Sequence, residues 1–321
     1  MSLIGVFNKV KKDIKAIEKE ISESISTDQR DLYLASTHLL KAGGKRIRPI
    51  FVLLSGRFGD YNFENVKKVA ASLELIHMAT LVHDDVIDDA EKRRGDLTVK
   101  AQWDNKVAMY TGDYLLAEAL MKITEIEKPE IHQTLSKSIV RMCEGEIDQI
   151  RDFNDWNQSF KNYLLRIKRK TALLIAISCK LGALVTDADP KTVRRLYRYG
   201  YNVGMAFQII DDILDFTGTT EQLGKPAGSD LRQGNITLPA LYALHYSKEK
   251  DLLREIINNN QLEEKIDEVI TIIRQSEGIE FSKKIAQQYI QKAKDAALSL
   301  QNIPERKMLL EISDFIGERS Y

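Results

Sequence analysis

The sequence predicts an all-α protein, a single large helical bundle over residues 1–321. Apolar residues recur at intervals of three and four along most of the chain, the spacing that gathers them on one face of a helix. Only 6 prolines and 17 glycines interrupt the 321 residues, and alternating strand-like patterns are scarce. No linker rich in Pro, Gly or Ser divides the chain, so we expect roughly ten or more helices around one core.

Composition limits the kinds of partner that the chain can have. Hydrophobic residues make up 43% of the chain and charged residues 29%, while Lys plus Arg and Asp plus Glu are both 47. A net charge of zero gives no reason to expect a nucleic-acid partner. No apolar run reaches the roughly 18 residues of a transmembrane helix, and the N-terminus lacks a secretory signal core. With only Cys143 and Cys179, both expected as reduced thiols, we expect a cytoplasmic protein.

The first helix should span residues 1–25. Its apolar side is formed by Val6, Val10, Ile14, Ile17 and Ile21, with lysines around it. Such a helix packs on its own bundle or on a partner subunit, and its basic character also allows contact with a membrane surface.

Two aspartate-rich pentamers follow apolar helical segments. The pattern Asp-Asp-x-x-Asp occurs at residues 84–88 and again at 211–215. A chain with 24 aspartates placed at random would hold about 0.1 such patterns, so two are meaningful. Because residues i and i+4 share a helix face, the first and last aspartate of each pentamer should project together. These faces carry His77, Asp84 and Asp88 in the first segment, and Gln208, Asp211 and Asp215 in the second.

Like-charged carboxylates beside apolar helices indicate a bound cation, because burying them uncompensated is costly. Mg²⁺ suits such oxygen ligands and shares its coordination shell with water and substrate phosphate. The alternatives are two solvated acidic helix ends, a calcium loop or a di-iron site. The central glycine of an EF-hand is missing, and only one Glu-x-x-His pair is present, Glu74 with His77.

Basic clusters near the pentamers could bind the phosphates. They are Gly-Gly-Lys-Arg-Ile-Arg-Pro at 43–49, Lys-Arg-Arg-Gly at 92–95, Lys-Arg-Lys-Thr at 168–171 and Gly-Lys-Pro at 224–226. Arginine suits bidentate phosphate contacts, and lysine acts as a point charge. The chain has no P-loop, dinucleotide fingerprint or serine-hydrolase elbow, so a diphosphate held by magnesium and these cations is the expected ligand.

In order and spacing, these motifs resemble those of the trans-type polyprenyl diphosphate synthases. The resemblance rests on GGKRIRP at 43–49, HDDVIDDAEKRRG at 83–95, KT at 170–171, FQIIDDILDFTG at 207–218 and GKPAGSDLRQGNITLP at 224–239. It covers nearly the whole chain. It implies a helical bundle of the isoprenoid synthase type around a deep central cavity, and a magnesium-dependent condensation of isopentenyl diphosphate with an allylic diphosphate.

The resemblance also implies roles for single residues. Metal binding falls to Asp84, Asp88, Asp211 and Asp215, with Asp212 nearby and three Mg²⁺ ions expected when substrate is bound. Isopentenyl diphosphate falls to Lys45, Arg48, His77 and Arg94, and the allylic diphosphate to Arg93, Lys170, Thr171, Gln208 and Lys225. Thr171 and Gln208 would present oxygen dipoles to the developing allylic cation. Asn235 stands where the family often has Lys, which removes one phosphate contact, and Arg319 receives no role.

Product length is implied by small residues on the segment before the first pentamer. Ala79 and Thr80 lie five and four residues before Asp84, where bulky aromatics in this family stop chain growth early. Leu75 and Ile76 lie about one turn deeper, at a rise of about 5.4 Å. We therefore expect a hexaprenyl to octaprenyl product, with heptaprenyl favoured, for quinone side chains such as that of menaquinone.

The chain looks most like the catalytic component, component 2, of bacterial two-component heptaprenyl diphosphate synthases. That likeness implies a small regulatory partner subunit, with a homodimer as the other arrangement, and peripheral membrane contact during product release. A class I terpene cyclase and a non-catalytic regulatory subunit stay open as alternatives. Lys45 and Arg48 argue against a cyclase, which needs no isopentenyl site, and the two intact pentamers argue against a non-catalytic subunit.

Overall fold

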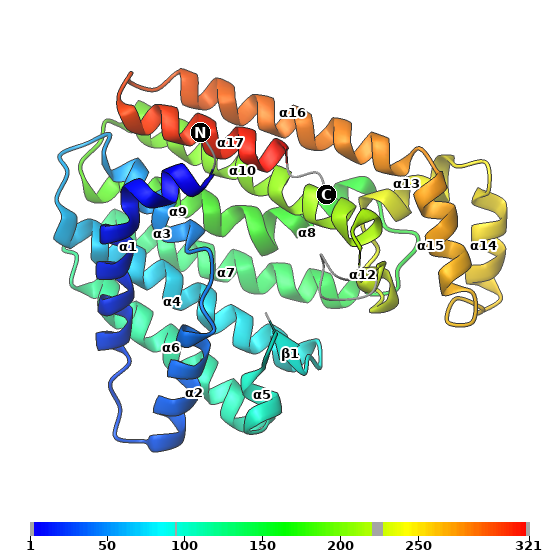
Figure 1. Ribbon diagram of the computed structural model, residues 1–321, viewed down its shortest axis with the longest axis horizontal. Helices are drawn as coiled ribbons and strands as arrows, with labels where there is room; N and C mark the ends of the chain where they lie inside the picture. Colours follow the sequence, from blue (N-terminus) through cyan, green and yellow to red (C-terminus); the bar gives the residue numbers. More distant parts are fainter. Residues whose placement is uncertain (1–2, 94, 220–226, 319–321) are drawn as a thin grey trace. The chain divides into compact units, whose positions relative to one another are not determined.

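The computed structural model describes residues 3–93, 95–219 and 227–318, and within them it is helical apart from one short hairpin (Figure 1). The predicted all-α fold class is confirmed. The helices before the hairpin are α1 (Leu3–Ser24), α2 (Arg30–Lys41), α3 (Ile47–Gly56) and α4 (Phe63–Ile87). The hairpin pairs β1 (Lys92–Arg93) with β2 (Asp96–Leu97).

The remaining helices follow in chain order. They are α5 (Val99–Gln102), α6 (Asn105–Thr124), α7 (Pro129–Arg151), α8 (Phe160–Ile167), the π-helix η1 (Lys168–Ala172), α9 (Leu173–Val185) and α10 (Pro190–Thr217). After the second pentamer come α12 (Ser229–Arg232), α13 (Leu238–Tyr246), α14 (Lys250–Asn258), α15 (Ile266–Gln275), α16 (Gly278–Leu298) and α17 (Pro304–Gly317). Among the described residues, none of these helices is both long and apolar enough to cross a membrane.

The chain divides into two compact units. Unit 1 comprises Met1–Ser136, Ile177–Tyr197 and Leu300–Leu309, and unit 2 comprises Lys137–Ala176, Arg198–Ser299 and Leu310–Tyr321. A single domain over the whole chain stays a prediction.

In unit 1, α4 is the central helix. It runs side by side with α6 and also packs against α1 and α3 (Figure 1). Asn62 caps its start by accepting the N–H of Asn65 at 3.1 Å, a bond that satisfies one donor left open by the first turn. The apolar side of α1, predicted from Val6 to Ile21, is buried and packs against α3 and α4.

A glycine fixes the last turn of α4 against α6. A Cβ atom at Gly112 would lie 2.2 Å from His83 Nε2, so a larger residue at this crossing would displace the His83 ring. The same nitrogen lies 3.3 Å from the Met109 carbonyl oxygen and 3.3 Å from Asp113 Oδ1. Because His83 directly precedes the first pentamer, this contact fixes the position and rotation of the helix end that carries the aspartates.

In unit 2, two close helix approaches hold η1 in place. A Cβ atom at Gly204 on α10 would lie 2.5 Å from Ala172 Cα, and one at Gly145 on α7 would lie 2.5 Å from Arg169 Cβ. Arg169 also forms ion pairs with Glu144 and Asp148 on α7. The π-helix therefore packs closely against both α7 and α10, and this close approach depends on Gly145 and Gly204.

Candidate active site

The first pentamer lies at the C-terminal end of α4. Asp84 is half-buried, Asp85 is only 2% exposed and Asp88, the residue that caps the helix, is exposed. The Asp88 N–H donates to the Asp84 carbonyl oxygen at 2.8 Å, so the helical geometry extends to the last aspartate. Asp84 and Asp88 therefore occupy successive turns on one side of the helix end, as their spacing predicts.

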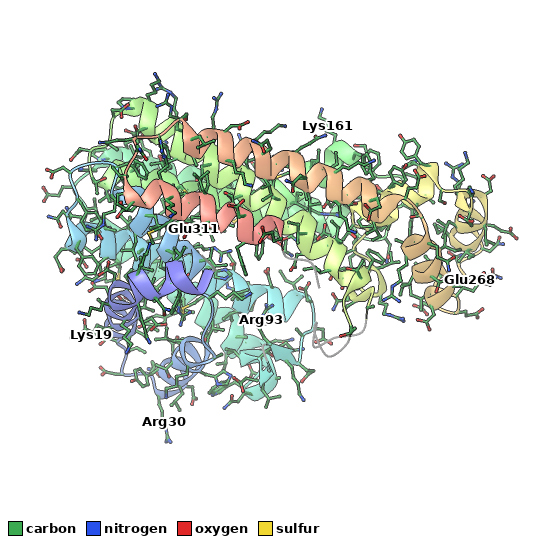
Figure 2. All side chains as sticks on the ribbon, turned by 45° about the horizontal axis from the view of Figure 1, so that its top comes forward. Lys19, Arg30, Arg93, Lys161, Glu268 and Glu311 are labelled. Carbon is green, nitrogen blue, oxygen red and sulfur yellow. The ribbon has the colours of Figure 1, made fainter. Side chains whose placement is uncertain are left out.

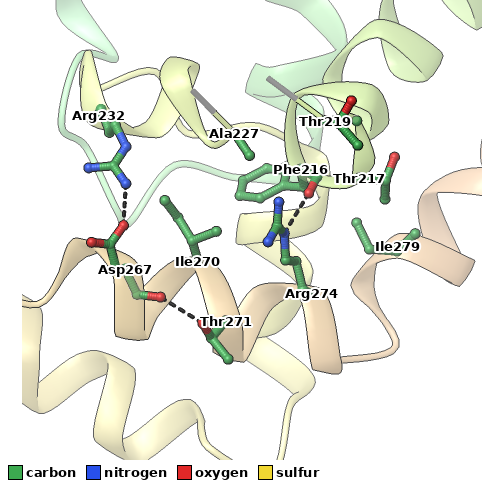
Figure 3. Close-up of a pocket in the computed structure, with 11 residues that line it drawn as sticks. Phe216, Thr217, Thr219, Ala227, Arg232, Asp267, Ile270, Thr271, Arg274 and Ile279 are labelled. Carbon is green, nitrogen blue, oxygen red and sulfur yellow. Dashed lines mark hydrogen bonds and ion pairs between the residues drawn. The ribbon is translucent and has the colours of Figure 1, made fainter. Parts of the chain in front are cut away.

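Asp85 is neutralised within the structure. Arg93 on β1, labelled in Figure 2, donates to Asp85 Oδ1 through Nε at 2.8 Å and places Nη2 at 2.7 Å from the same oxygen. Burial raises the pKa of the Asp85 carboxyl, and the Arg93 guanidinium offsets part of that rise. Sequence reasoning assigned Arg93 to the allylic diphosphate, and that role stays a prediction for a residue that here holds the hairpin to α4.

The segment 43–49 turns one of its three cations inward. Arg46 lies in the left-handed region with φ 45° and is buried. Its guanidinium donates to Glu18 Oε1 at 3.0 Å, to Glu74 Oε1 at 3.1 Å and to the Leu40 carbonyl oxygen at 3.1 Å. Nothing in the sequence distinguishes Arg46 from Lys45 and Arg48, because all three cations belong to one basic motif.

The other members of the isopentenyl set remain nearer to solvent. Lys45 is exposed, and Arg48 and His77 are half-buried. The φ angles of Gly43 and Gly44 are 72° and 155°, which residues with a side chain rarely adopt. The two glycines thus allow the chain to turn directly before Lys45 and Arg46.

The second pentamer lies near the end of α10 in unit 2. Asp211 is exposed, whereas Asp212 and Asp215 are each 2% exposed. The Asp215 carboxylate accepts the Asp230 N–H at 3.2 Å, and the Asp215 carbonyl oxygen accepts the Gly228 N–H at 2.7 Å. The chain after α10 therefore folds back onto the last aspartate, a long-range contact that periodicity could not predict.

Asp212 is the centre of a buried hydrogen-bond network. Its Oδ2 accepts the Tyr163 hydroxyl at 2.6 Å, and its Oδ1 accepts the Gln208 amide N–H at 2.8 Å. Burial, followed by the charge of Asp230, raises the pKa of Asp212 to about 8, while these two hydrogen bonds act in the opposite direction. Tyr163 was missed by sequence reasoning, because nothing in its local sequence marks it.

The predicted pair Lys170 and Thr171 lies on η1. Thr171 Oγ1 donates to Gln208 Oε1 at 2.6 Å, and Lys170 Nζ donates to Gln149 Oε1 at 2.8 Å. A π-helix inserts one residue into the helical repeat and is frequent at functional sites. Here it lies between α8 and α9, where the sequence predicts only an ordinary helix.

The remaining predicted residues divide into two groups. Leu75, Ile76 and Ala79 are buried on α4, and Thr80 donates its hydroxyl to the His77 carbonyl oxygen at 2.8 Å. Arg94 and Lys225 lie outside the described residues. Unit 1 thus contains the first pentamer together with Lys45, Arg48 and His77. Unit 2 contains the second pentamer together with the hydrogen-bonded pair Thr171 and Gln208.

The order and identity of these motifs agree with a family comparison. The model of the polyprenyl synthetase family matches residues 29–273. The chain belongs to this family. The resemblance drawn from the five motifs is therefore confirmed, and a polyprenyl synthetase is an enzyme of prenyl transfer rather than a cyclase.

Relatives of known name support the same assignment. The heptaprenyl diphosphate synthase component 2 of Bacillus subtilis is 52% identical over 309 residues, covering 96% of this chain and 88% of the relative. Its namesake in Geobacillus stearothermophilus is 50% identical over 321 residues and is matched over the full length of both chains. The names of these polyprenyl synthetases indicate a two-component synthase.

Solved polyprenyl synthetase structures have the same fold. The heptaprenyl diphosphate synthase of Staphylococcus aureus gives a TM-score of 0.92 at 43% identity, covering 97% of this chain and 98% of that one. A polyprenyl synthase of Caulobacter crescentus, complexed with calcium and isoprenyl diphosphate, gives 0.92 at 32% identity, covering 99% and 98%.

The donor atoms of this polyprenyl synthetase fit a divalent cation. Carboxylate oxygens are the ligands that hard cations prefer, and Asp84, Asp88, Asp211 and Asp215 carry such oxygens near the ends of α4 and α10. Across residues 3–93, 95–219 and 227–318, no group of three or more His, Cys, Asp or Glu side chains is already arranged around one point. A cation that shares its shell with substrate phosphate needs no such preformed cage.

Proposed function

We propose that this chain condenses isopentenyl diphosphate with an allylic diphosphate, repeatedly, to give heptaprenyl diphosphate for quinone side chains. Two observations together carry the proposal. An Asp-Asp-x-x-Asp pentamer lies near the end of each of two apolar helices, and a hydrogen-bond network joins Thr171, Gln208 and Asp212. The relatives named heptaprenyl diphosphate synthase component 2, 52% and 50% identical, support the product.

The metal ligands would be Asp84 and Asp88 on one helix end and Asp211 and Asp215 on the other. We assign magnesium to them, with three ions when substrate is bound. Bound Mg²⁺ supplies electrostatic stabilisation of the charge that develops on the leaving diphosphate. In this proposal both pentamers act on one diphosphate.

The basic residues of the chain bind and orient the two substrates. Lys45, Arg48 and His77 would hold the diphosphate of isopentenyl diphosphate, and Lys170 that of the allylic primer. Binding both reactants in one orientation turns a bimolecular step into an effectively unimolecular one. The carbon–oxygen bond of the primer breaks with its electron pair going to the diphosphate. The isopentenyl double bond then attacks the allylic carbon, and the new chain loses a proton to the released diphosphate.

Thr171 and Gln208 would stabilise the allylic cation with oxygen dipoles. Their oxygens lie 2.6 Å apart and belong to η1 and α10, two elements fixed against each other by Gly204. Such preorganised dipoles need no rearrangement during the reaction. The apolar residues beside the pentamers would exclude water, which otherwise quenches the cation.

Chain length is assigned to α4. Ala79 and Thr80 are small and leave room one turn before Asp84, and Leu75 and Ile76 would meet the tail deeper along the same helix. This arrangement supports a medium-length product over a short one.

A partner subunit is part of the proposal. On α7 in unit 2, Val140, Ile147 and Ile150 are 57%, 65% and 57% exposed, and Cys143 is exposed between them. Their spacing of three and four residues forms an apolar stripe of the kind that packs against another helix. Because the relatives are named component 2, we assign the stripe to a helix of a small regulatory component.

The partner assignment is tested by co-expression with a candidate first component. Ile147→Asp should prevent co-purification, whereas Leu298→Asp, which alters a 55% exposed leucine on α16, should not. Retention of the complex by Ile147→Asp contradicts the assignment, and a stable dimer of the chain alone that dissociates in this variant assigns the stripe to a second copy instead.

We also place the chain in the cytoplasm, because both cysteines are free thiols, as a reducing compartment keeps them.

The function is tested with purified protein, magnesium, labelled isopentenyl diphosphate and a set of allylic primers, with and without the candidate component. Products separated by length should centre on heptaprenyl diphosphate. Release of diphosphate from the primer without incorporation of label is the behaviour of a cyclase and would contradict the proposal.

A further inference from the structure

The hydrogen bonds around Asp212 all run in one direction. Tyr163 donates its hydroxyl to Oδ2, Gln208 donates an amide N–H to Oδ1, and Thr171 donates its hydroxyl to the oxygen of that same amide, at 2.6, 2.8 and 2.6 Å. Tyr163 and Gln208 both donate to Asp212, so its carboxylate, when ionised, accepts at both of its oxygens.

This direction fixes which end of the Gln208 amide faces Thr171. With the amide reversed, its carbonyl oxygen would lie against an oxygen of Asp212, and two acceptors would oppose each other. In the observed orientation the Thr171 hydrogen is directed at the amide oxygen. The hydroxyl therefore keeps its lone pairs for whatever lies on its other side. In the reversed orientation an amide N–H would occupy those lone pairs and the Thr171 hydrogen would point outward.

Tyr163 holds the carboxylate in the position that selects this orientation. Tyr163 is fully buried on α8, and Asp212 is 2% exposed, so water cannot replace the hydroxyl as a donor. Tyr163 is itself packed beneath the Arg166 guanidinium, which lies 5.7 Å from its ring centre. Arg166 donates to Gln158 Oε1 at 3.0 Å and to the Ile236 carbonyl oxygen at 2.6 Å, which ties α8 to the loop before α13.

We infer that Tyr163 and Asp212 are positioning residues that orient the Gln208 amide so that Thr171 and Gln208 present oxygen, and not hydrogen, to the allylic cation. The inference rests on the proposed function, which supplies the cation. It separates Asp212 from its neighbours in the pentamer: Asp211 and Asp215 are assigned to metal, and Asp212 to orientation of an amide.

The variant Tyr163→Phe removes one hydroxyl and keeps the ring. The matched control is Tyr199→Phe, another fully buried tyrosine in unit 2, whose hydroxyl accepts from Ser313 at 3.4 Å outside this network. We expect Tyr163→Phe to lower kcat about tenfold, with the KM of each diphosphate within about twofold, because the lost interaction acts on the transition state. A primer fluorinated beside the reacting carbon should slow Tyr163→Phe by a larger factor than it slows wild type. The control should retain the wild-type kcat.

A double-mutant cycle with Gln208→Leu separates orientation from general weakening. With no amide to orient, adding Tyr163→Phe should cause no further loss of kcat. The inference is overturned if the two losses multiply, if Tyr199→Phe loses as much as Tyr163→Phe, or if the loss appears in KM alone.

A second measurement needs no turnover. In the NMR spectrum of ¹⁵N-labelled protein, the Gln208 side-chain amide should give one proton protected from exchange by Asp212, and Tyr163→Phe should abolish that protection while Tyr199→Phe keeps it. Unchanged protection in Tyr163→Phe overturns the inference. An inactive wild type with this protection pattern intact would instead refute the proposed function, and with it the catalytic purpose of the orientation.

Discussion

Arg46 Nη1 lies 3.1 Å from Glu74 Oε1, and both side chains are only 4% exposed. With Glu18 and the Leu40 carbonyl oxygen as further acceptors, this arginine joins α1, the end of α2, the start of α3 and the middle of α4. Lys45 precedes it directly, and His77 follows Glu74 by three residues. A buried ion pair thus fixes the backbone that carries the isopentenyl set.

Breaking this pair should unfold the protein more easily. Glu74→Ala leaves the Arg46 charge buried with only Glu18 as its acidic partner, which costs about 3 kcal/mol in comparable buried pairs. Urea denaturation followed by circular dichroism measures the change. The control is Glu23→Ala, which removes an exposed ion pair with Lys19 and should cost less than about 1 kcal/mol. Equal losses would show that the buried pair has no special role.

The pH dependence of stability should report on Glu20. Lys122 and Lys67 lie 2.9 and 3.0 Å from its carboxylate oxygens. Burial raises the pKa of Glu20, but the hydrogen bonds from the two lysines outweigh it, so the pKa lies below 4.5. A lowered folded-state pKa contributes stability above the unfolded value, which is lost as the pH falls through the folded value.

Glu20→Gln should therefore be less stable than wild type at pH 7, and the difference should shrink below about pH 4.5, where wild type loses the same contribution. Thermal melts between pH 3 and pH 7 measure it. A difference that stays constant across this range would contradict the ion-pair account.

The acidic pentamers should be needed for turnover and not for folding. Asp84→Ala and Asp211→Ala should each reduce kcat by at least about a hundredfold, because each removes part of the electrostatic stabilisation of the leaving group. Their helical circular dichroism should match that of wild type. Asp251→Ala, which alters an exposed aspartate on α14, is the control and should be fully active. Near-normal activity in either pentamer variant would refute the metal assignment, and chelation of magnesium should abolish turnover of the wild type.

Product length should respond to Ala79. The phenyl ring of Ala79→Phe would enter the space assigned to the growing tail, so shorter products should accumulate with the initial rate largely kept. Overpacking also costs about 1–3 kcal/mol. Ala293→Phe on α16, at another fully buried alanine, controls for that loss. An unchanged product distribution in Ala79→Phe would defeat the assignment of chain length to α4.

The helical fold could be predicted from the sequence because it depends on local patterns, and the same patterns select the candidate site residues. Apolar spacing marks α1, α4 and α10, and the pentamers stand at fixed positions on α4 and α10. None of the described helices is long and apolar enough to cross a membrane, in line with the lack of a long apolar run in the sequence. These features require only the repeat of an α-helix and the chemistry of the side chains.

What could not be predicted depends on contacts between distant residues. Tyr163 meets Asp212 across 49 positions, and Arg46 meets Glu74 across 28. The π-helix at Lys168–Ala172 depends on the close approach of α7 and α10, made possible by Gly145 and Gly204. The contact of Arg93 with Asp85 was not predicted either, because nothing in the pentamer distinguishes Asp85 from the other aspartates.

Manganese binding tests the central claim most directly, because Mn²⁺ replaces Mg²⁺ at oxygen ligands and is visible by electron paramagnetic resonance. With inorganic diphosphate present, wild type should show bound Mn²⁺ coupled to phosphorus, and both Asp84→Asn and Asp211→Asn should lose bound ions and weaken that coupling. If either variant kept the full number of bound ions and the full phosphorus coupling, the two pentamers would not hold one metal-bound diphosphate.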